Sequence, residues 1–236
     1  MQRLDYGIAY FHDRLPRVYD RNFLLVTDPD PDAKALTRAV DRLLGGVGLS
    51  HRKVVFENET TGRRMVGALG GEGWEYRRLA IMALRPGPGS DATRAAEATE
   101  VDRLALLPAL QTMIRMEPWE AGDTDEDVIR QLSAADEALE RAVAQRCFAR
   151  LVDGRVVSSC RLYSDGAIAQ IEDVATLPGH RQRGYAEAVM AKATSEASAG
   201  HELVFLTAVD GRWVKRWYER LGFDQIGLRY EATRSA

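Results

Sequence analysis

Hydrophobic and polar positions follow two different periods along the chain. Short stretches in which apolar residues alternate or run together predict strands, and longer ones in which they recur every three or four positions predict helices. In the first third of the chain, Asp30 and Pro31 resemble a helix start, and Gly45 with Gly46 resembles its end. The pattern there predicts a helix with Ala33, Leu36, Val40 and Leu43 on its apolar face, and strands at 22–26, 51–56, 64–69 and 74–84.

A break in this pattern follows the strand that ends at Leu84. The segment Arg85–Ser90 holds two prolines and two glycines, and such a segment continues neither a strand nor a helix. We therefore expect a first domain at 1–85, a linker at 86–99 and a second domain at 100–236.

The second part of the chain carries a longer series of elements. Asp153-Gly154 is typical of a tight turn between two strands, and Thr124 resembles a helix N-cap with Asp127 three residues on. The pattern predicts helices at 104–115, from Thr124 to Leu139, at 185–199 and at 213–221, and strands at 147–151, 156–163, 167–177, 203–208 and 223–230. The strand–helix–strand unit within this order requires a parallel crossover, so the fold class is mixed α/β.

Composition and charge narrow the classes of function. The 236 residues are 45% hydrophobic and 28% charged, with a net charge of -3. A slightly acidic chain is not typical of a nucleic-acid-binding protein. No apolar run approaches the roughly 18 residues of a membrane span, and Met1–Asp5 does not resemble a targeting leader. These observations predict a cytoplasmic protein with neither a nucleic-acid nor a membrane partner.

The cysteines and histidines do not suggest a metal or disulfide framework. Cys147 and Cys160 lie in apolar, strand-like stretches, which favours buried free thiols. The four histidines lack ligand-like spacing with Cys, Asp or Glu, and His180 is interpreted as a surface residue. We expect no metal.

The most informative segment is the loop between the strand that ends near Leu177 and the helix that begins near Gly184. The first turn of a helix presents backbone N–H groups without internal partners and the positive end of the helix dipole. Phosphate groups bind well at such a place, and a glycine lets them approach the backbone closely. Arg181 and Arg183 add positive charge. The alternative is a plain surface turn entering an amphipathic helix.

Three segments, in this order, resemble a known family. The hexapeptide Arg181–Ala186 resembles the R/Q-x-x-G-x-G/A signature of GNAT acyltransferases, Ile171–Val174 resembles the family's central strand, and Trp217–Phe223 resembles its late YExxGF element. The resemblance covers residues 100–231. It implies the GNAT fold, a mixed central sheet flanked by helices, and acetyl-CoA as the co-substrate.

The resemblance also implies the binding residues for coenzyme A. Its pantetheine arm would pair with the backbone of the central strand, and its pyrophosphate would lie on the N–H groups of the loop. The implied cofactor-binding residues are Val174, Ala175, Thr176, Arg181, Gln182, Arg183, Gly184, Tyr185 and Ala186.

Two carboxylates and a tyrosine are the candidates for catalysis. Glu172 and Asp173 are adjacent on a strand, so they face opposite sides unless a bulge turns both one way. We favour Glu172 as the base, because the family often uses a glutamate on this strand, with a salt bridge as the alternative role of either residue. Tyr218 is the candidate acid, and its alternative is a core tyrosine. Asp210 stands near the position where the family often has Asn, and we expect it to cap the following helix instead.

The first domain has the outline of a degenerate, shortened GNAT unit. In this interpretation, 74–84 ends where a central strand would end. The segment Arg85–Gly89 that follows is not a basic glycine turn, so we expect no second coenzyme site. The alternative is a separate small α/β domain with a structural role.

The sequence thus predicts an N-acetyltransferase that acts on a primary amine of a small molecule or a protein. Transfer from another acyl donor is an alternative, and so is a non-catalytic module that senses acyl-CoA. The acceptor stays open, as does the choice between a single chain and a homodimer.

Overall fold

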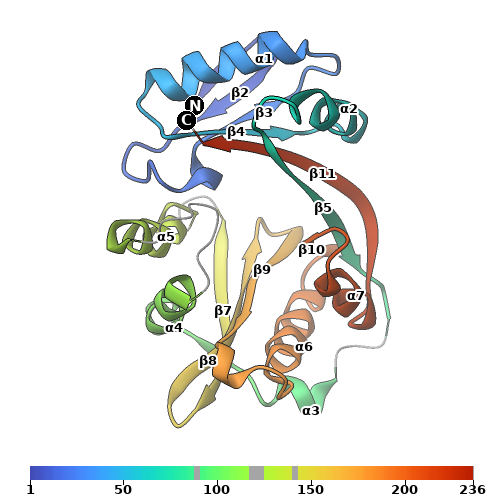
Figure 1. Cartoon of the computed structure of the whole chain (residues 1–236). Helices are drawn as coiled ribbons and strands as arrows, with labels where there is room; N and C mark the ends of the chain where they lie inside the picture. Colours follow the sequence, from blue (N-terminus) through green and yellow to red (C-terminus); the bar gives the residue numbers. More distant parts are fainter. Residues whose placement is uncertain (88–90, 117–124, 140–142, 236) are drawn as a thin grey trace. The chain divides into compact units, whose positions relative to one another are not determined.

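The computed structural model describes residues 1–87, 91–116, 125–139 and 143–235. The chain forms two compact units (Figure 1) that do not follow its order. Unit 1 contains Met1–Ile81, Thr207–Leu221 and Gln225–Ala236, and unit 2 contains Met82–Leu206 and Gly222–Asp224.

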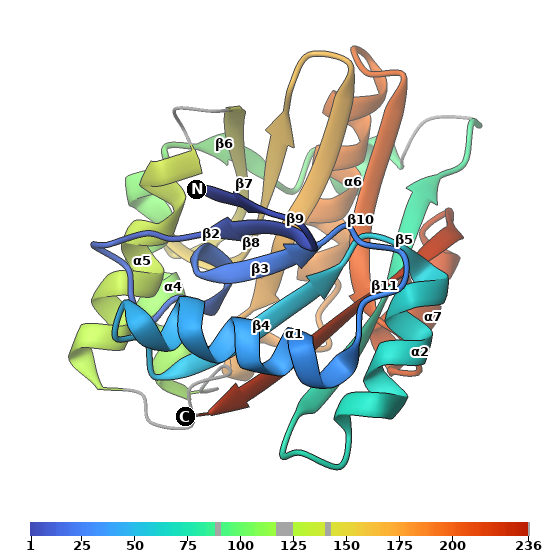
Figure 2. The ribbon, with the colours of Figure 1, turned by 90° about the horizontal axis from the view of Figure 1, so that it is seen from above.

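Unit 1 is built from the first part of the chain together with its C-terminal strand. Figure 2 shows helix α1 lying over strand β4, and buried side chains of α1 and α2 form one cluster with those of β3 and β4. The elements are β1 (Gln2–Leu4), β2 (Gly7–Tyr10), the short helix η1 (Tyr19–Arg21), β3 (Phe23–Val26), α1 (Ala33–Val40) with its π-helical continuation η2 (Asp41–Gly45), β4 (His51–Phe56), α2 (Glu59–Leu69), most of β5 (Glu75–Leu84), α7 (Trp213–Arg220) and most of β11 (Phe223–Ser235).

Unit 2 carries a second set of strands with helices on both faces. Figure 1 shows α6 on one face of β7, β8 and β9, and α4 and α5 on the other. The elements are α3 (Ala92–Ala95), β6 (Thr99–Val101), α4 (Arg103–Met116), α5 (Glu126–Leu139), β7 (Ala144–Val152), β8 (Arg155–Ser164), β9 (Ile168–Thr176), η3 (Pro178–His180), α6 (Tyr185–Ser198) and the first part of β10 (Leu203–Val209).

The two halves of the chain repeat one topology. In the first half, β1 pairs with β2 and β2 with β3 in antiparallel fashion, and β3 is parallel to β4 beyond helix α1. In the second half, β7, β8, β9 and β10 follow the same antiparallel, antiparallel, parallel order, and α6 takes the place of α1. The first half therefore repeats the topology of the second.

The C-terminal strand belongs to the core of unit 1. β11 pairs with β4 in antiparallel fashion, from Tyr230 opposite Phe56 to Ser235 opposite His51. Tyr230 and Ala232 are buried in one cluster with side chains of β3, β4, α1 and α2. The first 85 residues thus share their core with the last strand, which is why the observed units differ from the domain boundaries expected at 85 and 100.

Most predicted elements of the second half are confirmed, and β11 extends past the predicted end at 230. Asp153 and Gly154 both have left-handed backbones, with φ of 49° and 73°, as a two-residue hairpin turn requires. The β9–α6–β10 crossover is parallel. Helix α5 begins near Asp125, whose carboxylate accepts from the Val128 N–H at 2.9 Å, while the predicted N-cap Thr124 lies outside the described residues.

Two predictions in the first half are wrong. Residues 64–69 form the second half of helix α2, not a strand. Asn58 caps α2 by accepting from the Thr61 N–H at 3.0 Å, and the buried residues recur at helical spacing. The N-cap of α1 is Asp32, which accepts from the Ala35 N–H at 2.7 Å, so the helix starts two residues after the Asp30-Pro31 pair.

The expected linker also contains structured residues. Within 86–99, residues 92–95 form α3, which packs against α6, and Thr99 opens strand β6, which pairs with β7. Asp91 caps α3 by accepting from the N–H groups of Thr93 and Arg94. The segment from Asp91 onward is thus part of unit 2.

The packing of α2 on β11 predicts opposite effects for two glycines of one helix. A β-carbon on Gly62 would lie 2.7 Å from the β-carbon of Tyr230, whereas one on Gly67 would meet nothing within 4 Å. Alanine favours a helix over glycine by up to about 1 kcal/mol, and overpacking a core costs about 1–3 kcal/mol. We expect Gly67→Ala to raise the free energy of unfolding by up to about 1 kcal/mol, and Gly62→Ala to lower it.

Urea unfolding of the two variants beside the wild type measures both effects. Equal stabilisation by the two alanines would contradict the close contact between α2 and Tyr230.

Candidate functional site

Strand β9 contains a bulge at the two candidate carboxylates. On the β8 side, Ser159 lies opposite Ala175, but Arg161 lies opposite Glu172, so β9 has one extra residue in between. Asp173 lies within this irregularity and has a left-handed backbone, with φ of 53°. Such a bulge bends a strand and changes the direction of the side chains that follow it.

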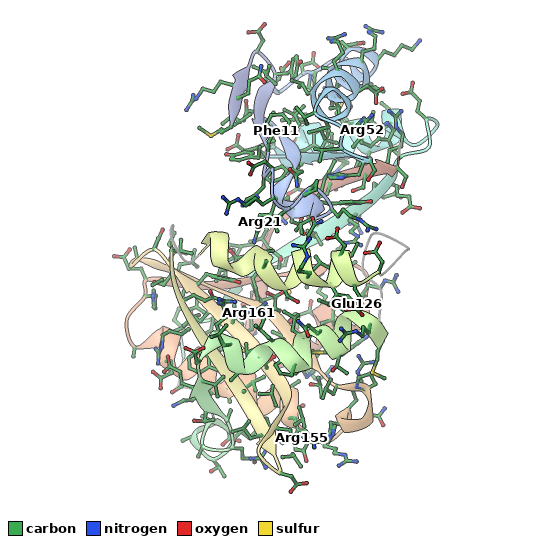
Figure 3. The ribbon with its side chains drawn as sticks, turned by 90° about the vertical axis from the view of Figure 1, so that its left-hand side faces the viewer. Phe11, Arg21, Arg52, Glu126, Arg155 and Arg161 are labelled. Carbon is green, nitrogen blue, oxygen red and sulfur yellow. The ribbon has the colours of Figure 1, made fainter. Side chains whose placement is uncertain are left out.

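The bulge places both carboxylates on the same face of the strands. Glu172 is directly opposite Arg161, and directly opposed residues of an antiparallel pair share a face. The Arg161 guanidinium in turn donates to Asp173 Oδ2 at 2.5 Å. The sequence left open whether a bulge would turn both carboxylates one way, and it does. Figure 3 shows Arg161 on the face that α4 and α5 cover.

The two carboxylates differ in their partners. Asp173 forms an ion pair with a guanidinium that is only 4% exposed, so a full positive charge holds its oxygen. Glu172 accepts a hydrogen bond from the Gln170 side-chain amide, which is a neutral donor.

The second half of β9 is paired with β8 on one edge, and its other edge is the one that β10 pairs with only near the start of the strand. On the β8 side, Ala175 and Thr176 lie opposite Ser159 and Ser158, and Ser158 Oγ is 2.9 Å from Thr176 Oγ1. Within unit 2, the pairing of β10 with β9 reaches only Ile171. The backbone of Val174, Ala175 and Thr176 can therefore pair with an extended ligand, in the way a strand is added to a sheet.

The loop after β9 has the geometry of an anion site. Gln182 and Gly184 both have left-handed backbones, with φ of 62° and 75°, and alternating left- and right-handed residues turn successive N–H groups toward one point. Gly184 is the N-cap of α6 and offers no side-chain hydrogen bond. The first helical bond runs from the Ala188 N–H to the Gly184 carbonyl at 3.0 Å, so the N–H groups of Tyr185, Ala186 and Glu187 precede the helical bonding pattern.

Four arginines lie on or beside this loop. Arg181 and Arg183 are exposed on it, and Arg181 Nε donates to the Thr176 carbonyl at 3.2 Å. Arg150 lies over the Tyr185 ring at 5.5 Å, and Arg94 pairs with Glu187 at 3.0 Å. The sequence pattern revealed only the first two, because Arg94 and Arg150 come from α3 and β7 and no spacing links them to the loop.

His180 is half-buried, whereas we interpreted it from the sequence as a surface residue. Its ring lies 6.4 Å from the Tyr185 ring, centroid to centroid. The short helix η3 turns this residue back toward α6, which the loop sequence alone did not indicate.

Tyr218 lies in unit 1, whereas β9 and the loop after it lie in unit 2. It lies on α7 in unit 1, is 6% exposed and contacts the Trp217 ring at 4.9 Å. Gly222 has the expected left-handed backbone, with φ of 96°. Both a core role and a catalytic role agree with this burial, so the acid role of Tyr218 stays a prediction.

We expected Asp210 to cap α7, but it does not. Arg212 is the N-cap, and no side chain bonds there. The Asp210 carboxylate instead pairs with Arg78 at 2.5 Å and Lys215 at 3.3 Å. Burial by itself raises the pKa of Asp210, but the bonds and charges of Lys215 and Arg78 together lower it.

The remaining predictions concern thiols, metals and membranes. Cys147 and Cys160 are buried thiols that form no disulfide, as predicted, and burial raises the pKa of the Cys160 thiol far above its usual range. Among the described residues, His, Cys, Asp and Glu form no group of three that could hold a metal ion. In the same part of the chain, every helix is too short or too polar to cross a bilayer.

The left-handed backbone of Asp173 predicts a difference between two variants that both lose the carboxylate. Glycine adopts this conformation freely, whereas an ordinary side chain costs about 1–2 kcal/mol there. We expect Asp173→Gly and Asp173→Ala both to be less stable than the wild type, because each removes the ion pair with Arg161. We expect the free energy of unfolding of the alanine variant to be lower than that of the glycine variant by about 1–2 kcal/mol in chemical unfolding. Equal stability of the two would mean that the bulge does not survive loss of the carboxylate.

A family model and several solved structures resemble this chain. The model of the acetyltransferase (GNAT) family matches residues 99–223, which is more than half of the sequence. A comparison with curated proteins finds no match. A functionally unknown conserved protein from Staphylococcus epidermidis ATCC 12228 is 11% identical with a TM-score of 0.73, and the alignment covers 100% of this chain and 93% of that one.

Two further structures carry GNAT names. A GCN5-related N-acetyltransferase from Kribbella flavida is 19% identical with a TM-score of 0.61, and the alignment covers 100% of this chain and 90% of that protein. A tandem GNAT protein from the clavulanic acid biosynthesis pathway is 13% identical with a TM-score of 0.55, covering 90% and 73%. At these identities the likeness concerns the fold alone, and the tandem arrangement agrees with the repeated topology. The family match, the ordered motifs and the fold together show that this chain belongs to the GNAT acetyltransferase family.

Proposed function

We propose that the protein is an acetyl-CoA-dependent N-acetyltransferase that transfers the acetyl group to a primary amine. The observation that carries this proposal is the loop from Arg181 to Gly184, whose two left-handed residues turn N–H groups outward at the start of α6. The loop follows directly on β9, which carries the two carboxylates.

The residues present fit coenzyme A. The N–H groups from Arg181 to Ala186 would hold its pyrophosphate, and Gly184 has no side chain of its own to stand between the phosphates and this backbone. The backbone of Val174, Ala175 and Thr176 would hold the pantetheine arm as an added strand. Coenzyme A supplies the activated thioester, and no residue of the chain needs to form a covalent bond with the acetyl group.

Glu172 is the proposed general base. An alkyl ammonium has a pKa near ~10.4 and must lose a proton before its nitrogen can attack. Glu172 would take that proton, directly or through a water, and pass it to solvent before the neutral amine attacks. Once the C–N bond has formed, the nitrogen carries a positive charge and would lose a second proton by the same route as the C–S bond breaks. Asp173 has a positioning role in this proposal, because Arg161 holds its carboxylate.

Tyr218 is the proposed acid. Its hydroxyl would give a proton to the departing thiolate of coenzyme A and regain one from solvent. Of the two protons that the ammonium loses, the equivalent of one then ends on the thiol and the other is released to solvent. The position of Tyr218 in the motif Trp217–Phe223 and the left-handed Gly222 that ends α7 support this role.

The acceptor is proposed only as a class, a primary amine of a small molecule or a protein. A longer acyl-CoA as donor is the alternative, since the loop and β9 would contact only parts that all acyl-CoA molecules share. A non-catalytic sensor is the other alternative, and the presence of Tyr218 together with a carboxylate on the central strand disfavours it.

Coenzyme binding is the first test of the proposal. A ligand that binds only the folded state raises its stability, by about 2.7 kcal/mol at a hundredfold excess over Kd. We expect acetyl-CoA to raise the melting temperature of the wild type, and Gly184→Asp to abolish the rise because a carboxylate would enter the pyrophosphate site. Gly200→Asp, which adds the same charge just after the other end of α6, controls for the added charge and should keep the rise. A wild-type melting temperature that is unchanged up to millimolar acetyl-CoA would refute the proposal.

The base is tested by the pH dependence of turnover, followed as thiol release with an amine accepted by the wild type. We expect Glu172→Gln to lower kcat most near neutral pH, by about 10²-fold. The loss should shrink as the pH rises toward the amine pKa of about 10.4, because the amine then deprotonates in solution. Asp173→Asn is the control, since asparagine tolerates the left-handed backbone, and its profile should keep the wild-type shape. The reverse pattern would assign the base to Asp173.

A further inference from the structure

Besides the four arginines at the loop, a carboxylate lies there too, and it is paired with one of the four. Glu187, in the first turn of α6, accepts from Arg94 Nη1 at 3.0 Å. Arg94 comes from α3, which precedes the part of the chain that the family model matches. The contact therefore adds to the loop a residue that the family motif does not contain.

The Arg94–Glu187 pair lies directly against the N-cap glycine. A β-carbon on Gly184 would lie 2.9 Å from Arg94 Nη1 and 3.5 Å from Glu187 Oε2. The guanidinium is thus within van der Waals distance of the backbone whose N–H groups open α6. Its only acidic partners among the described residues are Glu187 and, at 3.8 Å, Asp91.

This pairing is one that a phosphate can replace. The side chains of Arg94 and Glu187 are 46% and 36% exposed, and an exposed ion pair of this kind contributes little net stability. A guanidinium binds phosphate through two parallel hydrogen bonds, which are stronger than a single bond to a carboxylate. The exposure leaves Arg94 free to turn between the two partners.

We propose that Arg94 binds the pyrophosphate of the acyl-CoA, exchanging Glu187 for it when the coenzyme enters. The inference rests on the proposed function and adds a residue to its binding site. Glu187 then has a defined role as the competing anion that holds Arg94 beside Gly184 before binding. Asp91 supports this placement, because it caps α3 at the Arg94 N–H.

Titration calorimetry with coenzyme A tests this exchange in the full-length chain. We expect Arg94→Ala to weaken binding by about 10-fold or more, and Arg94→Lys to weaken it less, since lysine keeps the charge but not the fork. We expect Glu187→Gln to tighten binding severalfold, because the competing carboxylate is gone. Arg130→Ala is the matched control, since Arg130 forms an exposed ion pair with Asp127 on α5, and it should leave the affinity unchanged.

Dephospho-coenzyme A, which lacks the 3′-phosphate, identifies the phosphate involved. An equal loss by Arg94→Ala for both ligands supports the pyrophosphate contact. A loss seen only with intact coenzyme A would overturn it in favour of the 3′-phosphate.

Three further outcomes would overturn the inference. Unchanged affinity in Arg94→Ala, with a lower melting temperature alone, would mean that Arg94 only ties α3 to α6. Weaker binding by Glu187→Gln, a variant that keeps Arg94, would exclude competition between the carboxylate and the phosphate. A wild type that binds no coenzyme A would refute the proposed function itself, whereas normal wild-type binding with an unaffected Arg94→Ala variant refutes the role of Arg94 alone.

Discussion

The ion pair between Arg161 and Asp173 fixes the geometry on which the candidate site depends. Asp173 has a left-handed backbone in the middle of a strand, and the buried guanidinium holds its carboxylate there. A regular strand would place Glu172 and Asp173 on opposite faces. With the bulge, both carboxylates face the side of α4 and α5, where Asp173 pairs with the buried arginine and Glu172 accepts a hydrogen bond from the Gln170 amide. A single backbone irregularity thus brings both candidate carboxylates to one face of the strands.

The parts of the fold that could be predicted from the sequence are those specified by local chemistry. Asp153-Gly154 needs left-handed backbones and so predicts its hairpin, and the loop before Tyr185 predicts a helix start. Residues 64–69 were predicted as a strand because Gly62 and Gly67 obscure the helical pattern, and only the Asn58 cap and the packing on Tyr230 explain the helix. The bulge in β9 and the contact of Arg94 with α6 depend on residues far apart in sequence, so no local pattern could reveal them.

The repeated topology identifies the loop of the first half that corresponds to the candidate anion site, and the two loops differ in chemistry. The loop between β3 and α1 in the first half corresponds to the loop between β9 and α6, which corrects the expectation that strand 74–84 takes the central place. It reads Thr27-Asp28-Pro29-Asp30-Pro31-Asp32, with three carboxylates and two residues that lack an N–H. Asp32 occupies the start of α1 with its own side chain, at 2.7 Å from the Ala35 nitrogen. Carboxylates repel a phosphate and prolines cannot donate to it, so these residues disfavour a second anion site.

The course of the last strand shows that the first half is more than an appendage to the second. The family match ends at residue 223, yet β11 continues to Ser235 and pairs with β4 along the core of unit 1. Tyr230 and Ala232 fill that core, and α7 with Tyr218 belongs to the same unit. Without the first 81 residues, β11 would lose its partner β4 and expose these buried side chains to water, which the hydrophobic effect opposes. The chain therefore folds its GNAT motifs across both units, and the element that carries the candidate acid depends on a unit that the first half largely builds.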